Sequence, residues 1–267
     1  MRDGGVRTGM SERVFDGERP LRVATLFSDG ASGVRYLLST AGPWEFVGAV
    51  ASDPDAPGVD ALEAAGVEVT VRDLRAFYAD RDATTDDMEV RRAFDEGTRD
   101  RLLSLDPPPD LVLLSGYRWI VTAPLVDAVP VLNVHPGDLA VEVGGERAYT
   151  GLDPVSEAVA SGDRVTRSTV HFVTAAVDAG PVLVRSRPLP VHRELVDGLR
   201  ANGADDALDR YVDAHQEWMK WAGDGPALAT ALELVAAGRV ERAGDAVRVD
   251  GEPGFYDLGD GGVVRRR

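Results

Sequence analysis

Three side chains with complementary chemistry lie beside apolar segments in the middle of the chain. Asn133 and His135 end one apolar run, and Asp178 follows in a Val-Asp-Ala-Gly-Pro turn. An amide and an imidazolium donate hydrogen bonds to a developing oxyanion, and a nearby carboxylate stabilises the imidazolium and helps to remove a proton. Because Asn133 and His135 are two residues apart, their side chains share one face of a strand. These residue types therefore predict acyl-group transfer.

Each of these residues also has an ordinary structural explanation. A histidine at a strand end is often structural, and asparagine and aspartate are common turn residues. An unpaired amide is costly inside an apolar segment, which favours a specific role for Asn133. His171 lies in another apolar segment, and both a hydrogen-bonded core histidine and a site residue fit its sequence context.

Two loops are candidates for ligand binding. The segment 28–33 follows an apolar run and is rich in glycine and serine, so its backbone N–H groups could hold an anion at a helix start. A plain turn is the alternative, and Asp29 would repel a phosphate. The aromatic segment 117–120 could hold a planar heterocycle, although ordinary packing explains it as well. No spacing of histidines or carboxylates calls for a metal, so we expect none.

The elements that must position these side chains alternate between strand and helix. Strands are expected at 21–27, 44–51, 68–71, 111–115, 131–134, 169–173 and 181–185, and helices at 34–40, 58–65, 86–105, 152–160, 205–221 and 226–237. This alternation predicts an α/β fold with a doubly wound, mostly parallel sheet. Ligands bind such sheets at the carboxyl ends of strands, where Asn133, His135 and the loop after Phe27 are expected.

The sequence pattern at the two ends of the chain differs from that of the middle. Residues 1–20 are polar and aperiodic, and we expect a flexible arm there. Residues 21–238 are expected to form the main domain, and 239–267 a C-terminal extension. That extension contains a hairpin at 240–250 with its turn near Gly244-Asp245.

Composition narrows the classes of function. The 267 residues suffice for one large or two small domains, and the apolar content of 44% is ordinary. The net charge of −16 disfavours binding to nucleic acid, and we expect no such partner. It fits a halophilic acidic protein or simply a soluble acidic protein from a GC-rich genome. No apolar run is long enough for a membrane span or a signal peptide, and no cysteine is present, so we expect a cytoplasmic protein without membrane contact.

Taken in order, these motifs resemble the folate-dependent formyltransferases, and most closely the branch that formylates phosphoribosylglycinamide in purine biosynthesis. The resemblance covers roughly residues 21–240 and rests on the segments 28–33, 111–120, Asn133-Val134-His135-Pro136, Gly151, 169–173 and Asp178-Ala179-Gly180-Pro181. It implies a Rossmann-like formyltransferase fold and 10-formyltetrahydrofolate as co-substrate. It also implies a small-molecule amine as the second substrate, and a monomer or homodimer.

The resemblance assigns roles by position. Asn133, His135 and Asp178 would be catalytic, and Arg118, Trp119, Ile120 and Val177, with the rest of the 174–178 turn, would hold the pterin. Gly30, Ser32 and Gly33 would hold the substrate phosphate, and Glu217 would meet the ribose hydroxyls.

Several departures from the family pattern lie on the amine side. Asp29 and Gly33 replace a glycine and an asparagine of the usual phosphate loop, the segment 137–140 is unusual, the loop 141–150 is enlarged, and Asp153 replaces a histidine. Formyl transfer is therefore better supported than the identity of the amine.

Four alternatives stay open at this point. The first is a formyltransferase for another amine, such as an amino sugar nucleotide. The second is a hydrolase that releases formate from formyltetrahydrofolate, although the twenty residues before the first strand leave no room for the regulatory domain expected of such hydrolases. The third is a non-catalytic nucleotide- or folate-binding module. The last, a NAD-type dehydrogenase, lacks a Gly-x-Gly-x-x-Gly segment after the first strand.

Overall fold

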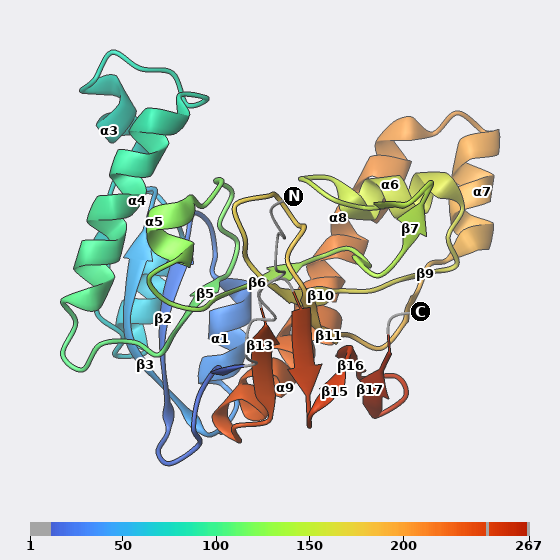
Figure 1. Ribbon diagram of the computed structural model, residues 1–267. Helices are drawn as coiled ribbons and strands as arrows, with labels where there is room; N and C mark the ends of the chain where they lie inside the picture. Colours follow the sequence, from blue (N-terminus) through green and yellow to red (C-terminus); the bar gives the residue numbers. More distant parts are fainter. Residues whose placement is uncertain (1–11, 244–245, 266–267) are drawn as a thin grey trace, which may run out of the picture.

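A central sheet organises the structure, a computed structural model that describes residues 12–243 and 246–265. Within these residues the sheet has nine strands in the order β17-β16-β11-β10-β6-β5-β2-β3-β4 (Figure 1). The strands are β2 (Leu21–Phe27), β3 (Trp44–Ala51), β4 (Val69–Val71), β5 (Leu111–Leu114), β6 (Val131–His135), β10 (Thr169–Phe172), β11 (Val182–Arg185), β16 (Phe255–Asp257) and β17 (Gly262–Val264).

Strands β4, β3, β2, β5 and β6 are parallel neighbours, and β10 enters antiparallel between β6 and β11. The predicted doubly wound, mostly parallel sheet is therefore confirmed. In β5 every residue is buried, and in β2 every residue except Arg22 is buried. Strands that are covered on both faces need such continuous apolar runs, which is why they were recognisable in the sequence.

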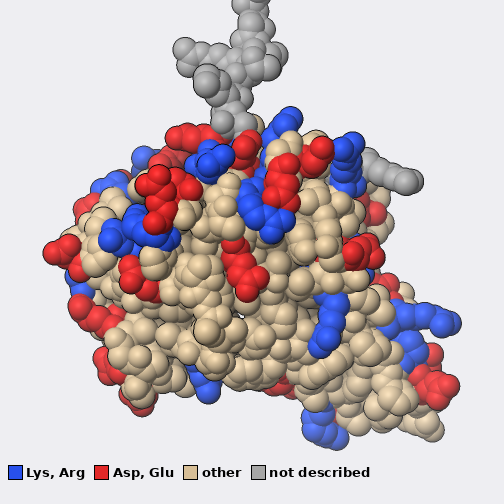
Figure 2. Space-filling view, turned by 90° about the horizontal axis from the view of Figure 1, so that it is seen from below, with Lys and Arg blue, Asp and Glu red and all other residues tan. Residues whose placement is uncertain are grey.

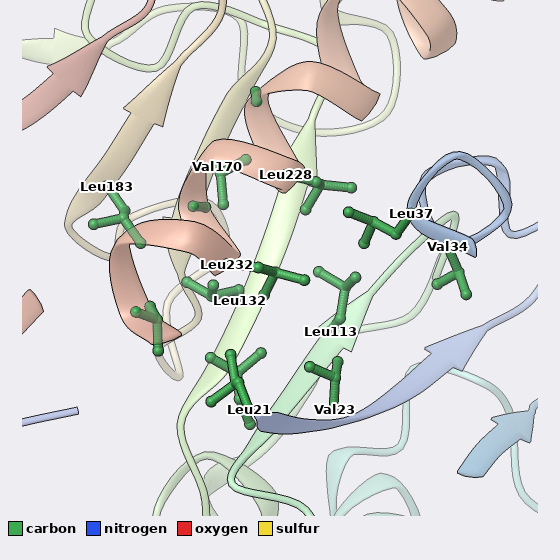
Figure 3. Packing of buried hydrophobic residues seen from close by; sticks show 14 of the residues in the cluster. Leu21, Val23, Val34, Leu37, Leu113, Leu132, Val170, Leu183, Leu228 and Leu232 are labelled. Carbon is green, nitrogen blue, oxygen red and sulfur yellow. The ribbon is translucent and has the colours of Figure 1, made fainter. Parts of the chain in front are cut away.

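Helices cover both faces of the sheet. One face packs against α1 (Ser32–Leu38), α2 (Gly58–Ala64) and α9 (Gly225–Ala236), and the other against α4 (Met88–Leu103) and α5 (Ala123–Val126). Figure 3 shows the first of these cores, in which Leu232 of α9 lies next to Leu132 of β6. Because side chains alternate along a strand, Asn133 and His135 lie on the opposite face from Leu132.

The remaining helices are α3 (Leu74–Ala79), α6 (Pro154–Ser161), α7 (Arg193–Ala201) and α8 (Asp205–Met219), followed by a π-helical turn η1 (Lys220–Asp224). The sequence did not predict α3 or α7. Helix α3 is too short to show a helical period, and the only fully buried residue of α7 is Val196. The two helices expected at 205–221 and 226–237 are present, and η1 joins them without a loop.

The described parts of the two chain ends meet on a second sheet, with the order β1-β13-β14-β15. Its strands are β1 (Glu12–Arg13), β13 (Val240–Ala243), β14 (Ala246–Val249) and β15 (Glu252–Pro253). Phe15 is buried in the main core. Residues 1–11 of the expected arm and the Gly244-Asp245 turn lie outside the described residues. The domain boundaries at 20/21 and 238/239 stay predictions.

Two short strand pairs lie outside the main sheet. They are β7 (Glu142–Val143) with β8 (Glu146–Arg147), and β9 (Val165–Thr166) with β12 (Leu189–Pro190).

Among the described helices, none combines the length and the apolar character that crossing a membrane requires. Figure 2 shows acidic and basic side chains interspersed on one face of the molecule, beside a broad area of other residues.

Candidate active site

Neighbouring strands β6 and β10 bring an amide and two imidazoles together. The register pairs Asn133 with His171 and His135 with Thr169, so these side chains lie on adjoining positions of two strands. Cross-strand partners in an antiparallel pair are in direct contact. The Nδ2 atom of Asn133 is 3.2 Å from the Nε2 atom of His171. The structure thus adds His171 to the two residues that the Asn-x-His pattern predicted.

The contacts of His171 define its protonation. Its Nδ1 atom is 3.0 Å from the carbonyl oxygen of Phe172, and because a carbonyl only accepts, Nδ1 carries the hydrogen. Nε2 is then free to accept a hydrogen bond from the Asn133 amide. Burial lowers the pKa of His171 to about 4, although the Asp178 carboxylate acts in the opposite direction. A neutral His171 therefore orients Asn133 with its NH₂ group toward the imidazole.

The carboxylate of Asp178 lies close to the imidazoles of both His135 and His171. Its Oδ2 atom is 3.7 Å from Nδ1 of His135, and its Oδ1 atom is 3.6 Å from Nε2 of His171. Gly151 N–H donates a hydrogen bond to Oδ2 at 2.8 Å. Asp178 has a φ of 50°, a left-handed conformation that aspartate tolerates better than most residues. One carboxylate therefore lies close to both imidazoles.

The turn that carries Asp178 is held by two features. The Nη1 atom of Arg147 donates to the carbonyl oxygens of Asp178 at 2.5 Å and of Gly180 at 2.8 Å. A Cβ atom on Gly180 would lie only 1.8 Å from the carbonyl oxygen of Phe172, so this position needs glycine. Close backbone approach therefore explains the glycine of the Asp-Ala-Gly-Pro motif.

The loop after β6 closes onto His135. The Nε2 atom of His135 donates to the carbonyl oxygen of Tyr149 at 2.6 Å, so Nδ1 is the nitrogen that faces Asp178. A Cβ atom on Gly137 would be 2.7 Å from that oxygen and 2.8 Å from Nε2. Glycine at 137 permits this contact, and Tyr149 adopts a φ of 58° to make it. Residues in sparsely populated backbone regions cluster at functional sites.

A large cavity opens over these side chains, with a volume of about 1040 Å³. Beyond Asn133, His135 and Asp178, its walls include the predicted ligand-binding residues Ser32, Arg118, Trp119, Ile120, Val177 and Glu217. Gly30 lines an adjoining pocket of about 250 Å³, together with Arg35, Lys220 and Trp221. Residues that are far apart in the sequence therefore line one continuous region.

Gly33 is the one predicted site residue that lies outside both cavities. Its N–H donates to the Oγ atom of Ser115 at 3.1 Å, and a Cβ atom would be 2.5 Å from Leu228. Its glycine is thus explained by helix packing. In the same loop, Asp29 accepts a hydrogen bond from Arg118 Nη2 at 3.1 Å, which offsets the negative charge that was expected to repel a phosphate.

Helix α4 supports the aromatic wall of the cavity from behind. Asp95 Oδ2 accepts hydrogen bonds from the backbone N–H of Thr122 at 2.7 Å and from its hydroxyl at 2.6 Å. The guanidinium carbon of Arg91 lies 5.0 Å from the ring centre of Trp119. Sequence reasoning missed Asp95, Arg91 and Arg147, because their neighbours in the sequence carry no motif.

Among the described residues, no group of three or more His, Cys, Asp or Glu side chains could hold a metal ion.

We expect His171 to make the protein sensitive to acid. Its folded pKa of about 4 lies below its ordinary value of 6.5, so the unfolded chain takes up a proton first as the pH falls. Neutral His171 contributes fully to the free energy of unfolding above pH 6.5, and this contribution, about 3 kcal/mol, is lost as the pH falls toward 4. In His171→Gln the corresponding pH dependence of the free energy of unfolding should be absent. Denaturant unfolding at about pH 7 and pH 4.5 checks it.

The informative quantity is the difference between variant and wild type. His215, whose pKa burial also lowers, and Asp224, whose pKa burial raises, titrate in both proteins and cancel in that difference. His192→Gln, at the exposed start of α7, is the matched control. Equal pH slopes in His171→Gln and the wild type would contradict the prediction.

The fold and the site together define a class. A mostly parallel sheet and the turn after β10 place an amide, two imidazoles and a carboxylate at one cavity, and these are residue types that can stabilise an oxyanion and move a proton. A model of the formyl transferase family matches residues 21–214, and the chain therefore belongs to this family. The resemblance to folate-dependent formyltransferases is thereby confirmed.

Individual relatives agree with this assignment. The phosphoribosylglycinamide formyltransferase of Mycobacterium tuberculosis is 31% identical over 180 residues, which are 64% of this chain and 72% of that protein. A formyltetrahydrofolate deformylase of Synechocystis is 33% identical over 104 residues, 39% of this chain and 34% of that protein. Glycinamide ribonucleotide transformylase 1 from Symbiobacterium toebii superposes with a TM-score of 0.62 and 27% identity, covering 88% of this chain and 95% of that one. The chain spans less than half the length of several curated relatives that it matches.

Proposed function

We propose that the protein transfers the formyl group of 10-formyltetrahydrofolate to a primary amine, with phosphoribosylglycinamide as the leading acceptor. The observation that carries the proposal is the placement of Asp178 between His135 and His171, with His171 directing the amide of Asn133. This arrangement supplies hydrogen-bond donors and a negative charge at the base of one cavity. Those are the groups that a tetrahedral oxyanion and a departing amine proton require.

The residues on one side of the cavity fit a folate. Trp119 and Ile120 provide apolar surface, and residues 174–178 line the same cavity. Val177 and Ile120 are both exposed and both line the cavity, which fits a site that a heterocycle covers. In this proposal the backbone groups of both segments bind the pterin, and the turn also delivers Asp178.

The smaller pocket and the adjoining wall of the main cavity fit a phosphorylated amine. Arg35 and Lys220 line the smaller pocket together with the backbone of residues 30–32. These two cations and the Ser32 hydroxyl would hold the phosphate, and the Arg118 guanidinium offsets Asp29 nearby. Glu217, which forms an ion pair with Lys220, lines both cavities and would accept hydrogen bonds from the ribose hydroxyls.

The mechanism follows from these positions. The substrate amine attacks the formyl carbon, and one N–H of Asn133 and the protonated His135 donate to the oxyanion. Asp178 stabilises the imidazolium and accepts the amine proton, directly or through a water. Collapse of the intermediate breaks the bond between the formyl carbon and the folate nitrogen, and the proton taken up by Asp178 passes to that nitrogen, so tetrahydrofolate leaves.

His135 cannot donate from Nε2 while that N–H is bound to the carbonyl oxygen of Tyr149. In the proposed mechanism the formyl oxygen takes the place of this carbonyl, so the loop 137–151 shifts when the donor binds. The glycines at 137, 144, 145 and 151 give this loop the backbone freedom to do so.

A second candidate function is hydrolysis of formyltetrahydrofolate, which the similarity to a deformylase supports. Water would then replace the amine as the nucleophile. The same three side chains would serve, so the two reactions differ only in what occupies the amine side of the cavity.

One assay tests both candidates. The protein is incubated with 10-formyltetrahydrofolate, with and without phosphoribosylglycinamide, at low and at molar potassium chloride, and release of tetrahydrofolate is followed. Release that requires the amine, with formylated amine as product, supports the proposal. Release without amine identifies a hydrolase. An absence of release in every condition contradicts hydrolysis and phosphoribosylglycinamide as the acceptor, and folate-induced thermal stabilisation would then point to a different amine.

A further inference from the structure

The C-terminal strand β16 is connected to the segment that follows His135. It lies parallel to β11 at the edge of the main sheet, where the register pairs Asp257 with Arg185 (Figure 1). The formyl transferase model matches residues 21–214, so β16 lies beyond the matched residues. The contacts that β16 makes with the site therefore belong to a part of the chain that the family model does not describe.

Four charged side chains join β16 to Asp138. Arg185 donates from Nε to Oδ2 of Asp257 at 2.9 Å and from Nη1 to Oδ2 of Asp138 at 3.2 Å. Arg167 donates from Nη1 to Oδ1 of Asp257 at 3.2 Å, and its Nε atom is 3.8 Å from Oδ2 of Asp138. The planar fork of a guanidinium group suits such a bridge. Each arginine therefore links the carboxylate of β16 to the carboxylate beside the site.

This ion-pair network is shielded from water. The side chain of Asp257 is 1% exposed, and the other three are 15–19% exposed. Burial acts to raise the pKa of Asp257, but the hydrogen bonds from Arg185 and from the N–H of Gly259, with the charges of both arginines, outweigh it and lower this pKa. Buried ion pairs add little net stability compared with apolar packing, whereas their directional hydrogen bonds fix the groups that they join. The network is therefore better suited to positioning than to stabilisation.

Apolar packing makes the same connection independently. Leu139, the residue after Asp138, is fully buried, and it forms a small core with Val182 of β11 and Phe255 of β16. The guanidinium carbon of Arg185 lies 5.2 Å from the ring centre of Phe255, so the ionic and apolar contacts adjoin. The C-terminal strand thus holds two consecutive residues of this segment by different interactions.

The segment that β16 holds lies beside His135. The N–H of Leu139 donates to the hydroxyl of Thr169 at 3.1 Å, and this hydroxyl donates to the carbonyl oxygen of Gly137 at 2.7 Å. Thr169 is the cross-strand partner of His135. A Cβ atom on Gly137 would be 2.8 Å from the Nε2 atom of His135. A displacement of this segment would therefore be felt at the imidazole.

We propose that Asp138 and Asp257 are positioning residues for formyl transfer, through which β16 anchors the beginning of the 137–151 loop. In the proposed mechanism this loop withdraws the carbonyl oxygen of Tyr149 from Nε2 of His135 when the donor binds. The anchor keeps the beginning of the loop in place while the rest moves, so the position of the formyl oxygen stays defined. This inference rests on the proposed function.

Hydrogen exchange and steady-state kinetics of Asp138→Ala and Asp257→Asn test the proposal. In the ligand-free variants the backbone amides of residues 139 and 141 should exchange at least about tenfold faster than in the wild type. Their acceptors are the Thr169 hydroxyl and the carbonyl oxygen of residue 138, which both substitutions leave in the chain. Faster exchange would therefore report a loosened segment.

The kinetic effect should fall on kcat. We expect kcat with phosphoribosylglycinamide to decrease by about ten- to hundredfold in both variants, because a misplacement of about 1 Å has effects of this size. The KM for 10-formyltetrahydrofolate should stay within about twofold, since the proposed pterin contacts lie on other segments. The double variant should be no more than about threefold slower than the slower single variant, because both substitutions break one network.

Asp250→Asn is the matched control. Asp250 is another C-terminal carboxylate that one arginine, Arg239, holds by two hydrogen bonds of 2.6 Å, but it lies between β14 and β15. Asparagine tolerates its left-handed backbone, which has a φ of 54°. This variant should keep kcat and the exchange of residues 139 and 141 within about twofold of the wild type.

Unchanged kcat and unchanged exchange in folded Asp138→Ala would overturn the proposal, even if Asp257→Asn fails to fold. A loss of kcat that only follows the loss of folded protein, measured by the stoichiometry of tetrahydrofolate binding, would show a structural role and overturn it as well. A wild type that does not formylate phosphoribosylglycinamide overturns the acceptor assignment of the proposed function. The exchange measurement needs no substrate, so faster exchange would then still support the anchor, and unaltered exchange would refute it.

Discussion

Replacement of His135 by alanine is expected to lower kcat for formyl transfer by about 10²–10⁴-fold, the range for loss of a positioned acid or base. His135 is buried, its Nδ1 faces Asp178 and its Nε2 faces the position that we assign to the formyl oxygen. The variant removes the proton donor and leaves Asp178 without its imidazolium partner. The KM for 10-formyltetrahydrofolate should change little, because the pterin walls lie on other segments.

The measurement is single-turnover and steady-state kinetics of His135→Ala, with circular dichroism to verify folding. His192→Ala serves as the control, since His192 lies outside the cavity and only caps α7 through the N–H of Leu195. That variant should lose about 1 kcal/mol of stability and no activity. A kcat for His135→Ala within about threefold of the wild type would rule out the catalytic role proposed for this residue.

Asp178→Asn is expected to reduce kcat by about 10²–10³-fold, which is again in the range for acid–base groups. Asparagine tolerates the left-handed backbone of position 178, and its carbonyl oxygen retains the hydrogen bond from Gly151. The variant therefore removes the negative charge while preserving the turn. Without that charge the imidazolium of His135 loses its stabilisation, and the amine proton loses its acceptor.

Three controls sharpen this prediction. Asp197→Asn removes an exposed carboxylate from a surface pair with Arg193, and its activity should equal that of the wild type. The affinity for 10-formyltetrahydrofolate, measured by calorimetry, should be kept in Asp178→Asn, because the backbone of the turn is unchanged. The double variant with His135→Ala should be hardly slower than His135→Ala alone, since groups that act as a unit are not additive. Multiplicative losses would argue that the two residues act separately.

The sequence predicted the central strands and helices of this fold well, because the residues that are buried there also form recognisable apolar patterns in the sequence. Strands β2 and β3 begin and end at the predicted residues. All of β2 except Arg22 and the second half of β3 are buried, and strands covered on both faces are rich in apolar residues. Helix α4 lies within the predicted segment for a similar reason, because one of its faces is buried. The predicted resemblance to formyltransferases rested on the order of several motifs along the chain, and the family model that matches residues 21–214 confirms it.

Elements without such a signal were found only in the structure. Helix α7 was not predicted, and Val196 is the only one of its residues that is fully buried. Strand β16 joins the edge of the main sheet through long-range pairing with β11, and β17 follows it as a hairpin. Asp257 of β16 is fully buried and pairs with Arg185 and Arg167, which ties the C-terminal segment to the main sheet. The sequence contains these charges, but nothing in their spacing indicates that they meet.

For the candidate site, the sequence by itself determined the residue types and the strand geometry that joins Asn133 to His135. Periodicity within one strand is a local property, and it is readable from residue types alone. The tertiary structure decided that Asp178 lies between two imidazoles and that His171 orients Asn133. These facts depend on contacts between segments distant along the chain, and such contacts are set by the packing of the whole sheet with its helices.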